Sequence, residues 1–317
     1  IVVYVDDLLV ASATKRDEEQ ALKDLHSFFP TKDLGEASFY LGCHISRDLD
    51  AGTLKLDQHQ YVQALVEGFE TTNAIPSAAG GKPLSKADGH QTHADAEKMR
   101  RTSCREAVGA LMWVATMTTS DLSFAAHQLA KFNGNPGPTQ ALQYLWRTRN
   151  LGITFGDTPG KGAKLSAWVD ADHGTCPDTR RSVSGGAVMI GNGAISWLSR
   201  VQKVTAAASS ESEYVVLAEI VTELRSLRQV KKFMMPPIDT RIKIHEGNEG
   251  AIKMAKNGFS SRRTGHVDVK HHIIRDATDE GIVQVDHVRS GKQHSGILTK
   301  ALCVKTFEKH ARFLLLA

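Results

Sequence analysis

The stretch from residue 165 to residue 285 limits the possible folds most strongly. Three short apolar runs, over residues 165–169, 182–190 and 194–202, are joined by turns that contain glycine, and a long helical pattern runs from Ser210 to Met234. A strand pattern over residues 242–244, a short helix from Gly250, a helical stretch over 267–278 and a strand over 282–285 follow. Successive strands, a long helix, and then strands alternating with helices predict an α/β (α+β) domain with helices packed on a mixed sheet.

The first half of the chain has a weaker but regular pattern. It predicts strands over residues 1–5, 8–10, 39–45 and 52–56 and helices over 15–29 and 58–69. Residues 70–98 are rich in Gly, Ala, Ser and Thr and predict a solvated connector. Two helices over 101–129, broken near 118–121, a short helix over 141–147 and a strand over 152–155 lead to a boundary near 157–162. The tail from Lys305 to Leu316 is amphipathic, and we expect it to dock on a missing or neighbouring surface.

Size and composition exclude several classes of protein. A chain of 317 residues has room for about two domains. No apolar run approaches the roughly 18 residues of a membrane span, so we expect a soluble protein without a membrane partner. The four cysteines are scattered without paired spacing, which argues against a disulfide framework or a cysteine zinc site. The net charge of +4 permits nucleic-acid binding through a local basic face.

Asp6 and Asp7 lie between two short apolar runs that we expect to be buried strands of a hairpin. One interpretation is that they cap a solvent-exposed turn, where Asp is common. The other is a divalent-cation site for phosphoryl transfer, since hard oxygen ligands hold magnesium against a nucleotide triphosphate. The hairpin alone leaves both open.

Asp170 and Glu213 pose the same kind of choice. Asp170 ends the first strand of the second half, where a solvated carboxylate is ordinary, and Asp172 projects from the same side if the strand continues. Glu213 has capping-box spacing from Ser210 at the start of the long helix. Glu211 and Glu213 lie roughly 200° apart around a helix, so only one of them can face a site on the sheet.

Several ordered motifs together resemble the reverse transcriptase and ribonuclease H parts of copia-type LTR retrotransposon Pol polyproteins. Tyr4-Val5-Asp6-Asp7 is similar to the catalytic hairpin of reverse transcriptases. The most specific similarity covers Asp172 to Tyr214, and the segments that carry it there are Cys176 to Ser182, Ile195-Ser196-Trp197 and Ser209 to Tyr214. Leu41-Gly42, residues 108–112 and 132–136, Gln293-His294 and residues 298–302 extend it over nearly the whole chain.

The resemblance implies an architecture and a set of metal ligands. It implies the end of a reverse-transcriptase palm over residues 1–69, a linker and thumb or connection region over 70–160, a ribonuclease H-like domain over 161–303 and a tail over 304–317. Asp6 and Asp7 would hold Mg²⁺ (or Mn²⁺) in the polymerase. Asp170, Glu213 and Asp268 would hold it in the nuclease, where two ions activate water and stabilise the leaving oxygen.

The chain departs from the family pattern at three glycines. Gly247 stands at the third catalytic acid position, so a metal ligand is missing there. Glu246 is adjacent, but on a strand it points to the opposite face, so we expect it to substitute only if the backbone bulges by one residue. Gly265 replaces a basic residue, and Gly296 replaces the acid of the closing motif. These changes indicate a decaying copy with impaired activity.

Partners and location follow from the resemblance. An RNA/DNA hybrid or primer-template is the expected ligand, with phosphate contacts from Arg180, Arg181, Arg262, Arg263 and Lys270, although solvated charge explains these residues equally well. Because the sequence begins at the hairpin, we expect no polymerisation by this chain alone and a possible partner in the rest of the Pol polyprotein. Family analogy gives a cytoplasmic or nuclear location. The alternatives are a catalytically dead nucleic-acid-binding protein, a non-functional remnant, or a structural subunit of an intact copy.

Overall fold

The structure, a computed structural model, describes residues 1–69, 73–77, 84–85, 104–131, 139–156, 164–234, 241–257 and 265–315. Within these ranges, the side chains of residues 139, 257 and 265–271 are not described. The predicted connector over 70–98 and the predicted boundary over 157–162 therefore lie almost wholly outside the described residues.

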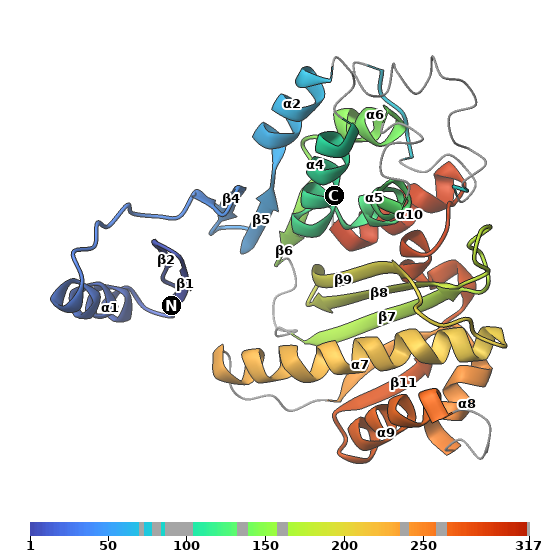
Figure 1. The fold of residues 1–317 in the computed structure, drawn as a ribbon. Helices are drawn as coiled ribbons and strands as arrows, with labels where there is room; N and C mark the ends of the chain where they lie inside the picture. The colour runs from blue at the N-terminus through green and yellow to red at the C-terminus, as the bar shows by residue number, and fades with distance from the viewer. Residues whose placement is uncertain are drawn as a thin grey trace.

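A five-stranded mixed sheet forms the centre of the second half (Figure 1). Its strands are β7 (Leu165–Asp172), β8 (Val183–Ile190), β9 (Gly193–Val201), β10 (Ile242–Glu246) and β11 (Val283–His287). In space they lie in the order β11-β10-β7-β8-β9; β7, β8 and β9 are antiparallel neighbours, and β10 is parallel to both β7 and β11. The strand order, with β7 in the middle, confirms the predicted ribonuclease H-like sheet.

One face of this sheet is covered by three helices, α7 (Ser209–Met234), α8 (Glu249–Asn257) and α9 (Gly265–Asp279) (Figure 1). Alternate residues of β7, namely Ala167, Val169 and Ala171, point to this side and join a core with Tyr214, Leu217 and other residues of α7. The length of α7 follows from its apolar face, which the sheet buries, and the predicted helix is confirmed to within one residue at its start.

The other face of the sheet is covered by helices from the middle and from the C-terminal part of the chain. These are α4 (Cys104–Met117), the short helix η2 (Ser120–Leu122), α5 (Ser123–Lys131), α6 (Thr139–Thr148), the short helices η3 (Ser290–Lys292) and η4 (His294–Leu298), and α10 (Val304–Leu315). Ala187 and Met189 of β8 share one core with Leu111, Leu145 and Leu314 from these helices. The C-terminal tail thus packs into the chain's own core, and the expectation that it docks on a missing or neighbouring surface is wrong. Its apolar face, including Phe307, is buried by this chain.

A second sheet has the order β3-β4-β5-β6, and all its pairs are antiparallel. It contains β3 (Phe39–Tyr40), β4 (Cys43–Asp48), β5 (Thr53–Asp57) and β6 (Gly152–Phe155), and α2 (His59–Gly68) follows β5. The single strand predicted over residues 39–45 is wrong, because Leu41 and Gly42 both have positive φ, 49° and 79°, and reverse the chain between β3 and β4.

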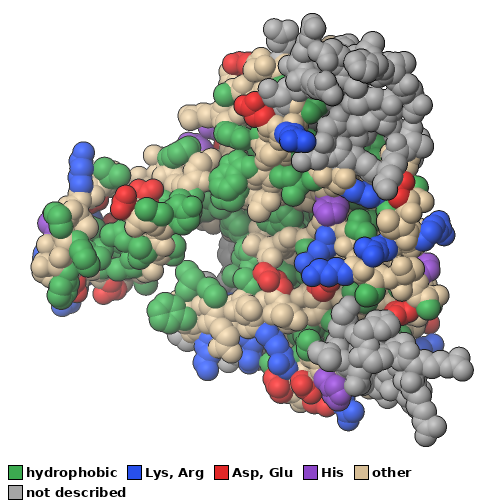
Figure 2. Space-filling view, in the orientation of Figure 1, with side chains coloured by type: hydrophobic (Ala, Val, Ile, Leu, Met, Phe, Trp, Pro, Cys, Tyr) green, Lys and Arg blue, Asp and Glu red, His purple; other side chains and the backbone are tan. Residues whose placement is uncertain are grey.

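The N-terminal hairpin pairs β1 (Val2–Tyr4) with β2 (Asp7–Leu9), and α1 (Lys15–Phe28) follows it. The expectation that these strands are buried is wrong: Val2 is 49% exposed and Val3 65%. Although β1 and β2 have apolar sequences, no other element of the described residues packs over them. Figures 1 and 2 show this arm standing away from the main body with hydrophobic side chains on its surface.

Two consecutive glycines let helices approach β8 from both faces. A Cβ on Gly185 would lie 2.4 Å from Thr299 Cγ2 and 3.0 Å from the Ser295 carbonyl oxygen, whereas one on Gly186 would lie 2.5 Å from Ile220 Cδ1 of α7. The side of β8 that meets η4 therefore has no room for a methyl group. This close approach brings the segment with Thr299 against the carboxyl end of β7.

We predict that Gly185→Ala destabilises the chain by about 1–3 kcal/mol, because the added methyl group overpacks a rigid contact. The matched control is Gly109→Ala, where a Cβ meets nothing within 4 Å on helix α4. There the same change should stabilise by about 0.5–1 kcal/mol through helix propensity. Urea unfolding of both variants measures the difference; equal effects at the two sites would contradict the packing argument.

Candidate active site

Asp170 lies near the carboxyl end of β7 and is only 8% exposed. Its Oδ2 accepts a hydrogen bond from the Thr299 hydroxyl and lies 3.1 Å from the Lys300 ammonium. Both partners follow directly after η4, which packs against β7 and β8 on that face of the sheet. The carboxylate is therefore oriented by a neutral donor and a cation, unlike a solvated strand-end Asp.

Glu213 reaches the same region from the first turn of α7. It is 8% exposed, and it accepts a hydrogen bond from the backbone N–H of Ala171, the residue after Asp170. The sequence allowed Glu213 to cap the helix by a hydrogen bond to the preceding backbone. Glu211 makes such a bond instead, because its Oε2 accepts a hydrogen bond from the Ala207 N–H at 2.6 Å. Of the two glutamates, Glu213 is thus the one that faces the sheet.

Glu246 ends β10 and is fully buried. Its Oε1 accepts a hydrogen bond from the Asn248 N–H at 2.7 Å. Burial first, and then the charge of Asp170, raise the pKa of Glu246 to about 8. The pairing of β10 with β7 and β11 runs without a bulge, so the backbone slip that would let Glu246 take the place of a ligand at Gly247 is not present in the described strand.

The three carboxylates form a buried group of like charges. Burial, followed by the charges of Glu246 and Asp170, raises the pKa of Glu213 to about 10. One oxygen of Glu213 and one of Glu246, in each case Oε2, are buried without a hydrogen-bond partner. Lys300 supplies a positive charge: although burial lowers its pKa, the charge and hydrogen bond of Asp170 raise it overall, so the ammonium form is kept.

A Cβ added at Gly296 and one added at Gly247 would meet different neighbours. A Cβ on Gly296 would lie 3.9 Å from Asp170 Oδ2 and 3.7 Å from Lys300 Cε. A Cβ on Gly247 would lie 3.5 Å from Gln293 Nε2, whose amide donates to the Val169 carbonyl oxygen. Both positions have room for a side chain at ordinary contact distances.

The remaining predicted residues are not brought to this group by anything described. Asp6 and Asp7 are exposed at the tip of the N-terminal hairpin. Arg180 and Arg181 are exposed in the connection from β7 to β8, and Arg180 has a positive φ of 55°. Asp268 and Lys270 belong to α9, but their side chains are among those not described, and Arg262 and Arg263 lie outside the described residues.

The donor chemistry of the buried carboxylates suits a divalent cation, but the ligand atoms of Asp170, Glu213 and Glu246 do not all lie within 4.8 Å of one another. Buried carboxylate oxygens without hydrogen-bond partners, on Glu213 and Glu246, are the hard ligands that Mg²⁺ and Mn²⁺ prefer. Sequence reasoning missed Lys300 and Thr299 as neighbours of Asp170, although both lie in the closing motif. Thr299 packs closely on Gly185 of β8, and from there Thr299 and Lys300 reach Asp170. These contacts show that the closing motif over residues 298–302 belongs to the candidate active site.

Sequence comparisons with known proteins identify relatives of the chain. Residues 1–82 match the family described as Reverse transcriptase (RNA-dependent DNA polymerase). The chain is 30% identical over 97% of its length to the Retrovirus-related Pol polyprotein from transposon TNT 1-94 of Nicotiana tabacum. It is 28% identical over 98% of its length to the corresponding polyprotein from transposon RE1 of Arabidopsis thaliana. The chain spans about a quarter of the length of these curated relatives, 24% and 21%.

Among solved structures, LC11-RNase H1 in complex with an RNA/DNA hybrid aligns with 43% of this chain and 94% of its own, at 14% identity and a TM-score of 0.32. A TM-score this low carries no argument, so the fold assignment rests on the strand order and register of the sheet. That sheet, with acids at the end of β7 and the start of α7 and with reverse transcriptase sequence before it, defines a reverse transcriptase and ribonuclease H type of protein. The chain belongs to the family of copia-type retrovirus-related Pol polyproteins. Both enzyme families generally depend on divalent metals.

We predict that Glu246→Gln flattens the pH dependence of stability. Between the ordinary glutamate value of 4.5 and about 8, the folded chain binds a proton at Glu246 that the unfolded chain does not. Stability therefore falls as pH rises through this window, and the variant should remove up to roughly 1.4 kcal/mol per pH unit of that fall.

The measurement is urea unfolding at several pH values without divalent metal. Glu249→Gln is the control, because it removes the same charge from an exposed position on α8. If both variants keep the slope of the parent chain, the buried carboxylate is not the source of the pH dependence.

Proposed function

We propose that this chain is the reverse-transcriptase end and ribonuclease H-like part of a retrotransposon Pol polyprotein. Its ancestral role is RNA-directed DNA synthesis together with metal-dependent cleavage of RNA in RNA/DNA hybrids. The nuclease activity is impaired here by the loss of a carboxylate at Gly247. The observation that carries the proposal is the buried group of Asp170, Glu213 and Glu246 at one end of the sheet, with two carboxylate oxygens lacking partners.

Asp170, Glu213 and Asp268 would hold Mg²⁺ or Mn²⁺ in the nuclease, and Glu246 would share that role only if its carboxylate moved toward them. When bound, such ions activate water and stabilise the charge that develops on the leaving oxygen. Thr299 and Lys300 orient the Asp170 carboxylate. The Oε2 atoms of Glu213 and Glu246 are buried from water. Asp6 and Asp7 would hold metal in the polymerase, with further palm and fingers residues contributed by the rest of the polyprotein.

The ligand we propose is an RNA/DNA hybrid or primer-template. Lys and Arg side chains gather on the side of the molecule where β7 ends, close to acidic ones (Figure 2). The exposed pair Arg180 and Arg181, on the loop that leaves β7, is suited to phosphate contacts beside the carboxylates. Arg262, Arg263 and Lys270 extend this proposal, and the family analogy adds a cytoplasmic or nuclear location.

We predict that Gly247→Asp increases cleavage of a labelled RNA/DNA hybrid in Mg²⁺ or Mn²⁺ by at least 10²-fold, since it restores a carboxylate ligand. The backbone accepts the change, because a Cβ there meets its neighbours at 3.5 Å or more. Gly247→Ala is the matched control with a Cβ but no ligand, and Asp170→Asn is the blank.

Each outcome separates the candidate functions. If only Gly247→Asp cleaves the hybrid, the site is that of a ribonuclease H disabled at one ligand. If the parent chain cleaves as well and Glu246→Gln abolishes it, Glu246 has taken over. If none of them cleaves, the nuclease proposal is wrong.

The second candidate is a catalytically dead nucleic-acid-binding protein. Two observations favour it: Gly247 and Gly296 lack the family acids, and the Lys300 ammonium already pairs with Asp170 at 3.1 Å. For this function we expect salt-sensitive hybrid binding without cleavage, reduced in the Arg180→Ala/Arg181→Ala double variant, as measured by fluorescence anisotropy at several salt concentrations. Absence of binding at low salt would instead indicate a non-functional remnant.

A further inference from the structure

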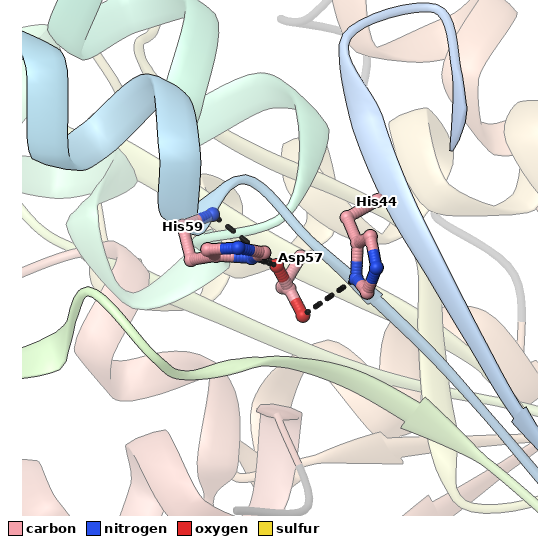
Figure 3. Close-up of side chains that lie close together, drawn as sticks. All are labelled: His44, Asp57 and His59. Atoms are coloured by element: carbon pink, nitrogen blue, oxygen red, sulfur yellow. Dashed lines mark hydrogen bonds and ion pairs between the residues drawn. The ribbon is translucent and has the colours of Figure 1, made fainter. Parts of the chain in front are cut away.

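A second group of ligand-type side chains lies in the first half of the chain, where β5 leads into α2 (Figure 3). His44 on β4 is the direct cross-strand partner of Asp57, the last residue of β5. His59 follows two residues later as the first residue of α2. Three elements thus bring two imidazoles to one carboxylate.

The Asp57 carboxylate is held between the two rings. Its Oδ1 lies 2.5 Å from His59 Nδ1, and its Oδ2 lies 3.6 Å from His44 Nδ1. The two rings meet edge to face with centroids 5.1 Å apart. Asp57 is 4% exposed, whereas about a third of each histidine side chain is exposed, so the group is anchored on the protein side and open toward solvent.

The spacing suits a transition metal. Ligand atoms of all three residues lie within 4.8 Å of one another, and no other group among the described residues meets this condition. A tetrahedral Zn²⁺ with bonds of about 2.0–2.1 Å places its ligands roughly 3.4 Å apart. Rotation of the two imidazoles, each about one third exposed, would bring the ligand atoms from within 4.8 Å of one another to the separation that Zn²⁺ requires.

We propose that His44, Asp57 and His59 form a binding site for Zn²⁺, separate from the carboxylates of the nuclease. Two imidazoles and one carboxylate are a donor set that favours Zn²⁺ over Mg²⁺, which prefers oxygen ligands only. Three protein ligands leave a fourth position for water on the open side. The metal would tie β4, β5 and the start of α2 together.

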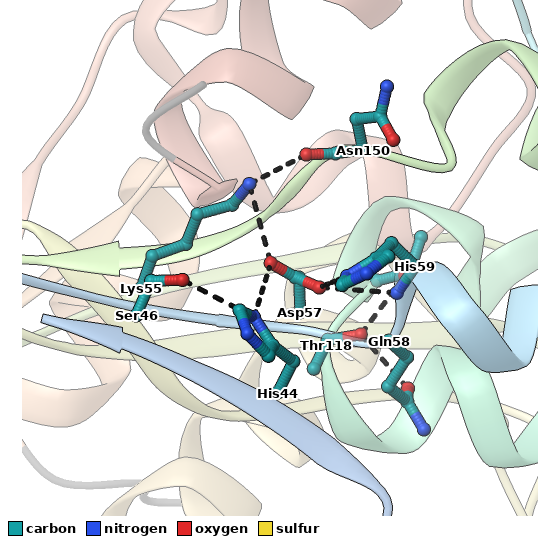
Figure 4. A network of polar contacts seen from close by, with 9 residues as sticks. His44, Ser46, Lys55, Asp57, Gln58, His59, Thr118 and Asn150 are labelled. Atoms are coloured by element: carbon teal, nitrogen blue, oxygen red, sulfur yellow. Dashed lines mark hydrogen bonds and ion pairs between the residues drawn. The ribbon is translucent and has the colours of Figure 1, made fainter. Parts of the chain in front are cut away.

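The competing explanation is a network of hydrogen bonds and ion pairs (Figure 4). Lys55 Nζ lies 3.5 Å from Asp57 Oδ2, and Asp57 Oδ1 accepts a 3.2 Å hydrogen bond from the His59 N–H at the start of α2. Lys55 also donates to the Asn150 carbonyl oxygen at 2.7 Å and is partly exposed, so a metal can displace it from Asp57 without leaving it unpaired. The network and the metal site therefore use the same residues and differ in whether Zn²⁺ binds.

The test is calorimetric titration of Zn²⁺ into the metal-free full-length chain, with millimolar Mg²⁺ present to occupy the nuclease carboxylates. His44→Gln is the variant of choice because the ring is partly exposed and its loss leaves the core intact. His26→Gln is the matched control, since His26 is an exposed histidine on α1. We expect the parent and His26→Gln to bind one equivalent that His44→Gln binds at least 10²-fold more weakly, beyond the effect of losing a supporting residue.

Two further measurements keep the outcome interpretable. Thermal unfolding without metal checks that His44→Gln is folded, and Zn²⁺ should raise the Tm of the parent but not of this variant. The Co²⁺ complex should show tetrahedral absorption without a thiolate charge-transfer band, which excludes binding at the cysteines. Equal Zn²⁺ affinity in the parent and His44→Gln, or no binding to the parent, would overturn the proposal and leave an ion-pair network only.

Discussion

The burial of strand β7 on both faces is the constraint on which the rest of the second half depends. Ala167, Val169 and Ala171 face α7, while the opposite face meets helices contributed by the middle and the end of the chain. β7 is also the central strand of the sheet, with β10 and β11 on one side and β8 and β9 on the other. The same burial places Asp170 where water is largely excluded.

That placement explains the chemistry of the candidate active site. Several carboxylates in one poorly hydrated region repel one another, so they either retain protons, as the raised pKa values of Glu213 and Glu246 indicate, or require a cation. The Lys300 ammonium supplies part of the positive charge that the carboxylates require. In the described structure this lysine pairs directly with Asp170, so part of the negative charge of the group is balanced without a metal.

Much of the fold could be predicted because it follows from periodicity. The strands and helices from β7 to β11 were expected within a few residues, since alternating and helical patterns are long there. The turn at Leu41-Gly42 was missed, because a leucine with positive φ gives no local signal. The contact of Lys300 with Asp170 results from long-range packing, and that of His44 with Asp57 results from the register of β4 and β5. Neither can be predicted from the sequence, because the sequence alone does not give the strand register or the packing.

The packing of helix α10 links the far end of the chain to the active site. Leu314 is buried in the core that also holds Leu298, and Leu298 directly precedes Thr299 and Lys300. The orientation of Asp170 therefore depends on residues that lie nearly 150 positions away in sequence and touch no carboxylate. Truncation of the Leu314 side chain would therefore loosen the hydrogen-bond donor and the counter-ion of Asp170 together while leaving every acid in place.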